Sequence, residues 1–155
     1  HTACRRQRQM CIRDSDYDVR NGRTYMYFEG EPLYPFGYGL SYTNFKIKNV
    51  RLNDTNFSKS DTLQITFNII NTGLRHGSEV PQLYIEENGI KKLKAFKRIF
   101  LNKDESLESS MKVAIKEFQS WDTNENKYIV KPGDYSIHLG TSSQDFLFTR
   151  NIKVN

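Results

Sequence analysis

An alternation of apolar and polar side chains constrains the fold of this chain more than any other feature. Leu63, Ile65, Phe67 and Ile69 are separated from one another by single polar residues. Side chains on a β-strand point alternately to opposite faces, so these four would share one face of a sheet. On a helix the same spacing would spread them around the circumference. The segment is therefore predicted to be a half-buried strand.

Similar short segments recur about every 10 to 15 residues along the chain, a spacing typical of antiparallel β-proteins. Asn88-Gly89 has the composition of a hairpin turn. Further strands are predicted at Phe45–Leu52, Val80–Glu86, Leu93–Leu101, Leu107–Ile115, Tyr128–Val130, Tyr135–Leu139 and Phe146–Val154. No segment has helical periodicity. About seven or eight strands within residues 43–155 favour an all-β immunoglobulin or fibronectin type III-like sandwich.

The alternation also predicts which side chains face the core. In the segment Val80–Glu86, Leu83 and Ile85 are expected on one face and Tyr84 on the other. In the last strand, one face is expected to hold four apolar side chains: Phe146, Phe148, Ile152 and Val154.

Tyr135 follows Lys131-Pro132-Gly133-Asp134 near the start of the penultimate predicted strand. Sandwiches of this class keep a corner tyrosine at such a position, and its hydroxyl bonds back to the preceding backbone. Ordinary core packing is the other interpretation.

The first fifteen residues differ abruptly in composition from the rest. Four arginines against Asp14 contribute +3 of the net charge of +5, and both cysteines, Cys4 and Cys11, lie here. A basic arm for nucleic acid is one interpretation. We favour a translated sequencing adaptor, so residues 1–15 are expected to be disordered and the natural chain to be truncated before residue 16.

Residues 22–43 are rich in aromatic side chains and contain almost no charge. Pro35, Gly37 and Gly39 exclude a regular helix or a central strand from this segment. Glycines between aromatic residues let the backbone follow a neighbouring surface while the rings fill pockets on that surface. The segment is therefore expected to dock on another domain.

No catalytic or metal-binding pattern is apparent. Hydrolysis by a pair of carboxyl groups needs the two groups opposed across the substrate, and the acidic residues here fall at predicted strand ends or outward positions. His1, His76 and His138 do not have the spacing of a zinc site. No cofactor is expected, and no apolar run reaches the ~20 residues of a membrane span.

Two further surface patterns are open to more than one interpretation. The run Lys91–Arg98 suits either an edge strand protected by lysines or a nucleic-acid stripe, and we favour the edge strand. Trp121 and Tyr128 suit either a sugar-stacking pair or a cap on one end of the sandwich.

Four segments resemble the C-terminal region of bacterial family-3 glycoside hydrolases. They are Gly22–Tyr25, Leu33–Tyr42, Gly77–Leu83 and Pro132–Tyr135. The resemblance implies that residues 16–42 are the tail of an upstream α/β domain with an aromatic linker, and that 43–155 are a fibronectin type III-like domain. It also implies that the catalytic nucleophile and acid/base lie in upstream domains, because no residue here corresponds to either.

By this resemblance the parent is a β-glucosidase or β-xylosidase, either periplasmic or secreted, whose oligosaccharide substrate is bound upstream. The partner of this chain would be the upstream domains of the same polypeptide, with no nucleic acid and no membrane involved. The residues expected to dock on those domains are Arg23, Tyr25, Pro35, Phe36, Tyr38, Leu40 and Tyr42. A carbohydrate-binding module and a free-standing adhesion-type sandwich are the alternative functions.

Overall fold

A computed structural model describes residues 18, 27 and 30–155 of the chain. The chain forms two compact units, 1–32 and 33–155, and every strand of the described residues belongs to the second unit. Arg23 and Tyr25 lie outside the described residues.

The second unit is almost entirely β-structure, which confirms the predicted fold class. The described part of the chain contains twelve strands: β1 (Phe45–Leu52), β2 (Asn56–Phe57), β3 (Thr62–Asn71), β4 (Gly77–Glu79), β5 (Gln82–Glu87), β6 (Ile90–Phe96), β7 (Ile99–Leu101), β8 (Ser106–Ala114), β9 (Ser120–Asp122), β10 (Lys127–Ile129), β11 (Gly133–Gly140) and β12 (Phe146–Val154). One short 3₁₀ turn, Ile115–Phe118, was not expected from the sequence. No helix in the described residues is long and apolar enough to cross a membrane.

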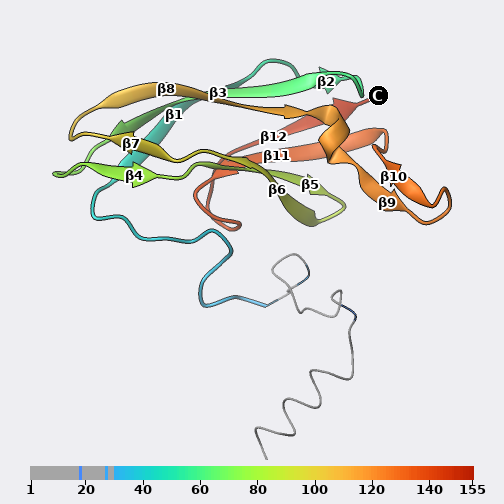
Figure 1. Cartoon of the computed structure of the whole chain (residues 1–155), viewed down its shortest axis with the longest axis horizontal. Helices are drawn as coiled ribbons and strands as arrows, with labels where there is room; N and C mark the ends of the chain where they lie inside the picture. Colours follow the sequence, from blue (N-terminus) through green and yellow to red (C-terminus); the bar gives the residue numbers. More distant parts are fainter. Residues whose placement is uncertain (1–17, 19–26, 28–29) are drawn as a thin grey trace, which may run out of the picture. The chain divides into compact units, whose positions relative to one another are not determined.

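Two larger sheets form the layers of the sandwich (Figure 1). One has the strand order β1-β3-β8, and the other has the order β2-β12-β11-β5-β6. Two small pairs, β4-β7 and β9-β10, extend from them. All neighbouring strands are antiparallel except β2 and β12.

The core lies between the two larger sheets. The four alternating side chains of β3 are fully buried there, as the sequence pattern predicts. They belong to one cluster with Leu83 and Ile85 of β5, and with Ile137 and Leu139 of β11. Burying one such side chain stabilises the folded state by ~1.5–3 kcal/mol before conformational entropy is counted.

The strand predicted at Val80–Glu86 is observed as β5, which begins two residues later, after Pro81, whereas the prediction of a single strand at Leu93–Leu101 was wrong. That segment is interrupted at Lys97 and Arg98 between β6 and β7. Proline has no N–H to donate to a ladder. At this point the Lys97 N–H donates to the Pro81 carbonyl, and the paired segments leave the β5-β6 ladder together to form β4-β7.

The prediction that Phe146 shares a face with Phe148 was also wrong. The pairing of β11 and β12 shifts between Leu139 and Gly140, so that Phe148 lies opposite Leu139 and Phe146 opposite Gly140. This bulge turns Phe146 to the outer face of the sheet, where its ring stacks on His138 with centroids 4.5 Å apart. Phe148 remains packed against the core.

The corner tyrosine is confirmed. The Tyr135 hydroxyl donates to the Lys131 carbonyl at 2.7 Å, and its ring meets Phe118 edge-on. Burial raises the pKa of Tyr135 to about 12. The hydroxyl therefore remains a donor throughout the physiological pH range.

The basic run of residues 91–98 lies largely on β6, which is an edge strand as predicted. One of its lysines reaches the 3₁₀ turn after β8, and another reaches β8 of the other sheet. The Lys94 ammonium donates to the Glu117 carbonyl, and the Lys97 ammonium donates to the Ser109 hydroxyl at 3.0 Å. Burial lowers the pKa of Lys94. Lys97 therefore links the two sheet layers, and Lys94 links β6 to the turn that follows β8.

Candidate functional site

The aromatic strip, Leu33–Tyr42, has no regular secondary structure and precedes β1 (Figure 1). Its apolar side chains are exposed to an unusual degree: Leu33, Leu40 and Tyr42 are 88%, 89% and 96% exposed. Tyr34, Phe36 and Tyr38 are also exposed, and Pro35 is half-buried. Side chains of this kind are normally covered in soluble proteins, so the strip is a candidate interaction surface.

The backbone of the strip, in contrast, is held firmly. Gly37 has φ of +81°, and the Tyr38 N–H donates to the Pro35 carbonyl at 3.0 Å, so residues 35–38 form a glycine-dependent turn. The Ser143 N–H donates to the Phe36 carbonyl at 2.8 Å. Tyr34 and Tyr38 lie with ring centroids 5.5 Å apart. The strip thus presents its rings from a fixed turn.

Gln82, at the start of β5, joins this turn to the sandwich. Its side-chain amide donates to the carbonyls of Gly37 and Thr141, at 3.0 and 2.7 Å. Its amide oxygen accepts from the Tyr84 hydroxyl at 2.6 Å. Tyr84 lies on the face opposite to Leu83 and Ile85, as the alternation predicts, and is fully buried there. The turn and the 141–145 loop both bond to the Gln82 amide beside this ring, and Phe146 meets the ring edge-on.

Asn71, at the end of β3, organises the other end of the strip. Its amide oxygen accepts from the Thr43 hydroxyl at 2.7 Å and from the Gly73 N–H at 3.1 Å. Its amide nitrogen donates to the carbonyls of Arg75 and Leu101, at 2.7 and 3.3 Å. Asn71 is fully buried and thus fixes three segments of chain with one side chain.

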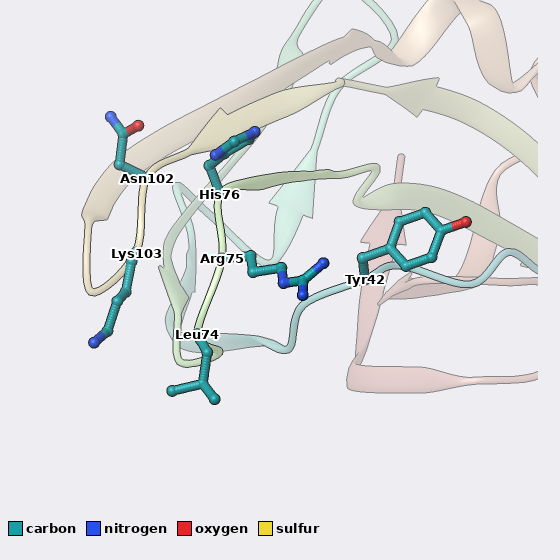
Figure 2. Close-up of a pocket in the computed structure, with 6 residues that line it drawn as sticks. All are labelled: Tyr42, Leu74, Arg75, His76, Asn102 and Lys103. Carbon is teal, nitrogen blue, oxygen red and sulfur yellow. The ribbon is translucent and has the colours of Figure 1, made fainter.

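A cationic pocket of about 630 Å³ is built from these three segments. It is lined by Tyr42 from the strip, Leu74, Arg75 and His76 from the loop before β4, and Asn102 and Lys103 from the loop after β7. In Figure 2 the Arg75 side chain extends towards Tyr42. The lining has two permanent cations and a histidine but no carboxylate.

A second groove, of about 560 Å³, lies between the strip and the sandwich. It is lined on one side by Tyr38 and Leu40 and on the other by Glu79 and the loop 141–145. The Asp145 carboxylate in this groove accepts from the Thr141 hydroxyl at 2.8 Å. The strip therefore has an accessible inner side as well as an exposed outer side.

His138 is buried on the outer face of the larger sheet, although the alternation in the sequence places it among the polar residues of its strand. Its Nδ1 lies 2.9 Å from the Thr149 hydroxyl and its Nε2 lies 3.1 Å from the Glu86 carboxylate. Burial lowers the pKa of His138, and the neighbouring Glu86 partly opposes this effect. The Lys91 ammonium lies 4.8 Å from the Phe146 ring that stacks on the histidine. The cluster is an enclosed structural element rather than an open site.

Trp121 and Tyr128 form a cross-strand pair on the hairpin of β9 and β10, with ring centroids 5.1 Å apart. Both are about half-exposed or more. In the part of the chain that the structure describes, no group of three or more His, Cys, Asp or Glu side chains is placed to hold a metal ion.

Sequence reasoning missed the importance of Asn71 and Gln82. The pattern predicts Asn71 only as the residue that ends a strand, and Gln82 only as a polar residue on the face opposite to Leu83 and Ile85. The available signal is weak, because both are single amides at strand ends. Gln82 is separated from Gly37 by 45 residues, and Asn71 from Leu101 by 30.

Comparison with known proteins identifies the domain. Residues 79–143 match the model of the fibronectin type III-like domain family. Over 84% of its length the chain is 36% identical to a xylan 1,4-beta-xylosidase of Xylanibacter ruminicola, and over 81% it is 30% identical to thermostable beta-glucosidase B of Acetivibrio thermocellus. A beta-glucosidase from Listeria innocua matches 90% of the chain with a TM-score of 0.75 at 27% identity. The chain spans only 15%, 17% and 20% of the lengths of these three proteins.

Proposed function

Since this chain carries the fibronectin type III-like domain of family-3 glycoside hydrolases, we propose that it is a non-catalytic accessory domain that docks on the catalytic domains of a β-glucosidase or β-xylosidase. The observation that carries the proposal is the aromatic strip. Its turn backbone is bonded to the sandwich through Gln82 and Ser143, while its apolar side chains face outward.

Such a strip is suited to a permanent intramolecular interface. An enclosed aromatic side chain buries ~150–250 Å². At ~25 cal/mol per Å², several such rings contribute many kcal/mol before ordering costs are counted. Those ordering costs are reduced here, because the backbone turn is already fixed in the isolated domain.

The parent chemistry is assigned to the upstream domains. Retaining glycosidases need two carboxyl groups ~5–5.5 Å apart in a substrate cleft. In the described residues, the acidic side chains that form hydrogen bonds or ion pairs do so with turn backbone, with nearby polar side chains, with lysines and with His138. We therefore expect the 155-residue chain alone to leave aryl β-glucosides and β-xylosides intact. Measurable turnover by the purified chain would contradict the proposal.

The docking role is tested by heat inactivation of the longer protein that carries this domain. Tyr38→Ser, in the strip, is expected to lower the half-inactivation temperature of glycosidase activity by several degrees. Tyr128→Ser is the matched control, because Tyr128 is also an exposed tyrosine in an aromatic pair but lies on the β9-β10 hairpin. Equal effects of the two substitutions would refute docking through the strip.

A further inference from the structure

The groove between the strip and the sandwich, which we call the inner groove, combines apolar walls with acidic groups. Its volume is about 560 Å³. Apolar surface comes from Tyr38 and Leu40 of the strip and from Val80, between β4 and β5. Two carboxylates also line the groove, Glu79 at the end of β4 and Asp145 just before β12. Among the described residues that line it there is no lysine, arginine or histidine.

The two walls of the inner groove are held in place around Gln82, which is only 5% exposed. Its amide nitrogen bonds to the carbonyls of Gly37 on one wall and Thr141 on the other. Gln82 lies opposite Gly140 in the β5-β11 ladder, and a Cβ on Gly140 would collide with the Asp145 carbonyl oxygen. The loop that carries Asp145 is therefore packed against this ladder. A side chain that enters the groove meets ordered walls, which lowers the entropic cost of binding.

Neither carboxylate of the inner groove is neutralised within the described part of the chain. The Glu79 Oε1 accepts from the Val80 N–H at 2.9 Å, and the Asp145 carboxylate accepts from the Thr141 hydroxyl at 2.8 Å. No ion pair between described residues includes either of them. An ionised carboxylate has about four acceptor positions, so both retain capacity for a donor. The groove is thus complementary to a positively charged group with an apolar part.

The inner groove is continuous with the aromatic strip, because Tyr38 and Leu40 belong to both. A domain that covers the strip therefore also reaches the groove. Arginine has the chemistry that the groove lacks: its apolar stem packs along apolar surface while the charged end stays with polar groups. Its planar guanidinium stacks on aromatic rings and forms two-point hydrogen bonds with carboxylates, which lysine cannot match.

From this combination we propose that the inner groove receives an arginine side chain of the upstream catalytic domains. The arginine stem packs beside Leu40 and Val80. The guanidinium lies by the Tyr38 ring and is neutralised by Glu79 and Asp145. This inference rests on the proposed docking function and adds the chemistry of the partner.

The first test is an NMR titration of the ¹⁵N-labelled 155-residue chain with three blocked tripeptides. Their central residue is arginine, lysine or citrulline, between two alanines; citrulline has the shape of arginine without its charge. The arginine peptide is expected to give saturable shifts centred on the amides of Glu79, Gln82, Thr141 and Asp145, and the citrulline peptide to bind at least tenfold more weakly. No saturable shift with the arginine peptide, or equal binding of the citrulline peptide, would overturn the proposal. Tighter binding of the lysine peptide would overturn the choice of arginine.

The double substitution Glu79→Gln with Asp145→Asn removes both charges but keeps the acceptor oxygens that the Val80 N–H and the Thr141 hydroxyl use. It is expected to weaken binding of the arginine peptide at least tenfold. Glu108→Gln is the matched control, because Glu108 is an exposed carboxylate on β8 without an ion pair among the described residues. The folded state of each variant is checked by its spectrum without peptide, and an equal loss in both would contradict the proposal.

Heat inactivation of the longer protein that carries this domain identifies the source of the arginine. The double variant is expected to lower the half-inactivation temperature of glycosidase activity by several degrees, and Glu108→Gln to leave it unchanged. A loss for Tyr38→Ser without any loss for the double variant would sink the arginine contact and keep docking through the strip. Equal effects of Tyr38→Ser and Tyr128→Ser would instead refute docking, and with it the catalytic domains as the source of the arginine.

Discussion

The aromatic strip and strand β3 contain similar apolar side chains but hold them in opposite environments. Leu63 of β3 is fully buried, whereas Leu40 of the strip is 89% exposed. In β3 the backbone follows a regular ladder and the side chains make the core. In the strip the backbone is bonded to the sandwich and the side chains face away from it. The apolar residues of β3 therefore stabilise this domain, and those of the strip are available to stabilise a complex.

The largest expected effect separates the two regions directly. Phe67→Ala in β3 is expected to lower the free energy of unfolding by ~3–5 kcal/mol, because it leaves a cavity among fully buried neighbours. Leu40→Ala is expected to change it by less than ~0.5 kcal/mol, as for other exposed positions. Urea denaturation of the 155-residue chain measures both. A loss for Leu40→Ala close to that for Phe67→Ala would mean that the strip belongs to the core.

The second prediction concerns the connection between the regions at Asn71. Asn71→Ala is expected to cost ~3 kcal/mol, because it leaves the buried partners of both amide atoms without hydrogen bonds. Asn151→Ala is a matched control, since among the described residues the exposed Asn151 amide accepts a hydrogen bond only from the Ser136 hydroxyl; its cost should stay below ~0.5 kcal/mol. Similar urea midpoints for the two variants would argue against Asn71 as the organising residue.

A smaller loss in the free energy of unfolding is expected at Gln82. Gln82→Met keeps the length of the side chain but loses its bonds to Gly37, Thr141 and Tyr84, at a cost of ~1–2 kcal/mol. The strip turn should then be cut faster by chymotrypsin at Phe36 and Tyr38. Gln64→Met on β3 is the control, and equal cleavage rates in the two variants would show that Gln82 does not hold the turn.

The smallest expected effect is a pH dependence from His138. Its pKa is lowered in the folded state, mainly by burial, so the unfolded chain binds a proton more readily. The contribution of His138 to the free energy of unfolding is therefore fully present above the ordinary histidine pKa of ~6.5. It is lost as the pH falls from there through the lowered pKa of the folded state. Glu86 opposes this shift and Lys91 adds to it.

Thermal unfolding of the chain between pH 7.5 and 5 measures this effect. His138→Gln is expected to flatten the fall of the unfolding temperature with falling pH. His76→Gln, in the pocket, should leave that fall unchanged. If the two variants decline equally, His138 is not the group responsible.

The sequence by itself determined the fold class and the core strand. Strict alternation in β3 can be satisfied only by a strand with one buried face, and the Pro-Gly turn before Tyr135 correctly located the corner tyrosine. It also predicted that residues 33–42 are an apolar segment without regular structure. These are local properties. They depend on how side chains alternate along a strand and on the backbone conformations that proline and glycine allow.

Only the tertiary structure decided where the chain changes sheets, that a bulge turns Phe146 outward, and that Tyr84 and His138 are buried on the outer face of a sheet. It alone revealed that two buried amides, Asn71 and Gln82, hold the strip and shape the pocket beside it. The physical reason is that a hydrogen bond between residues 30 or 45 positions apart leaves no periodic trace in sequence. Its partners become neighbours only when the strands and the strip are brought together in the folded domain.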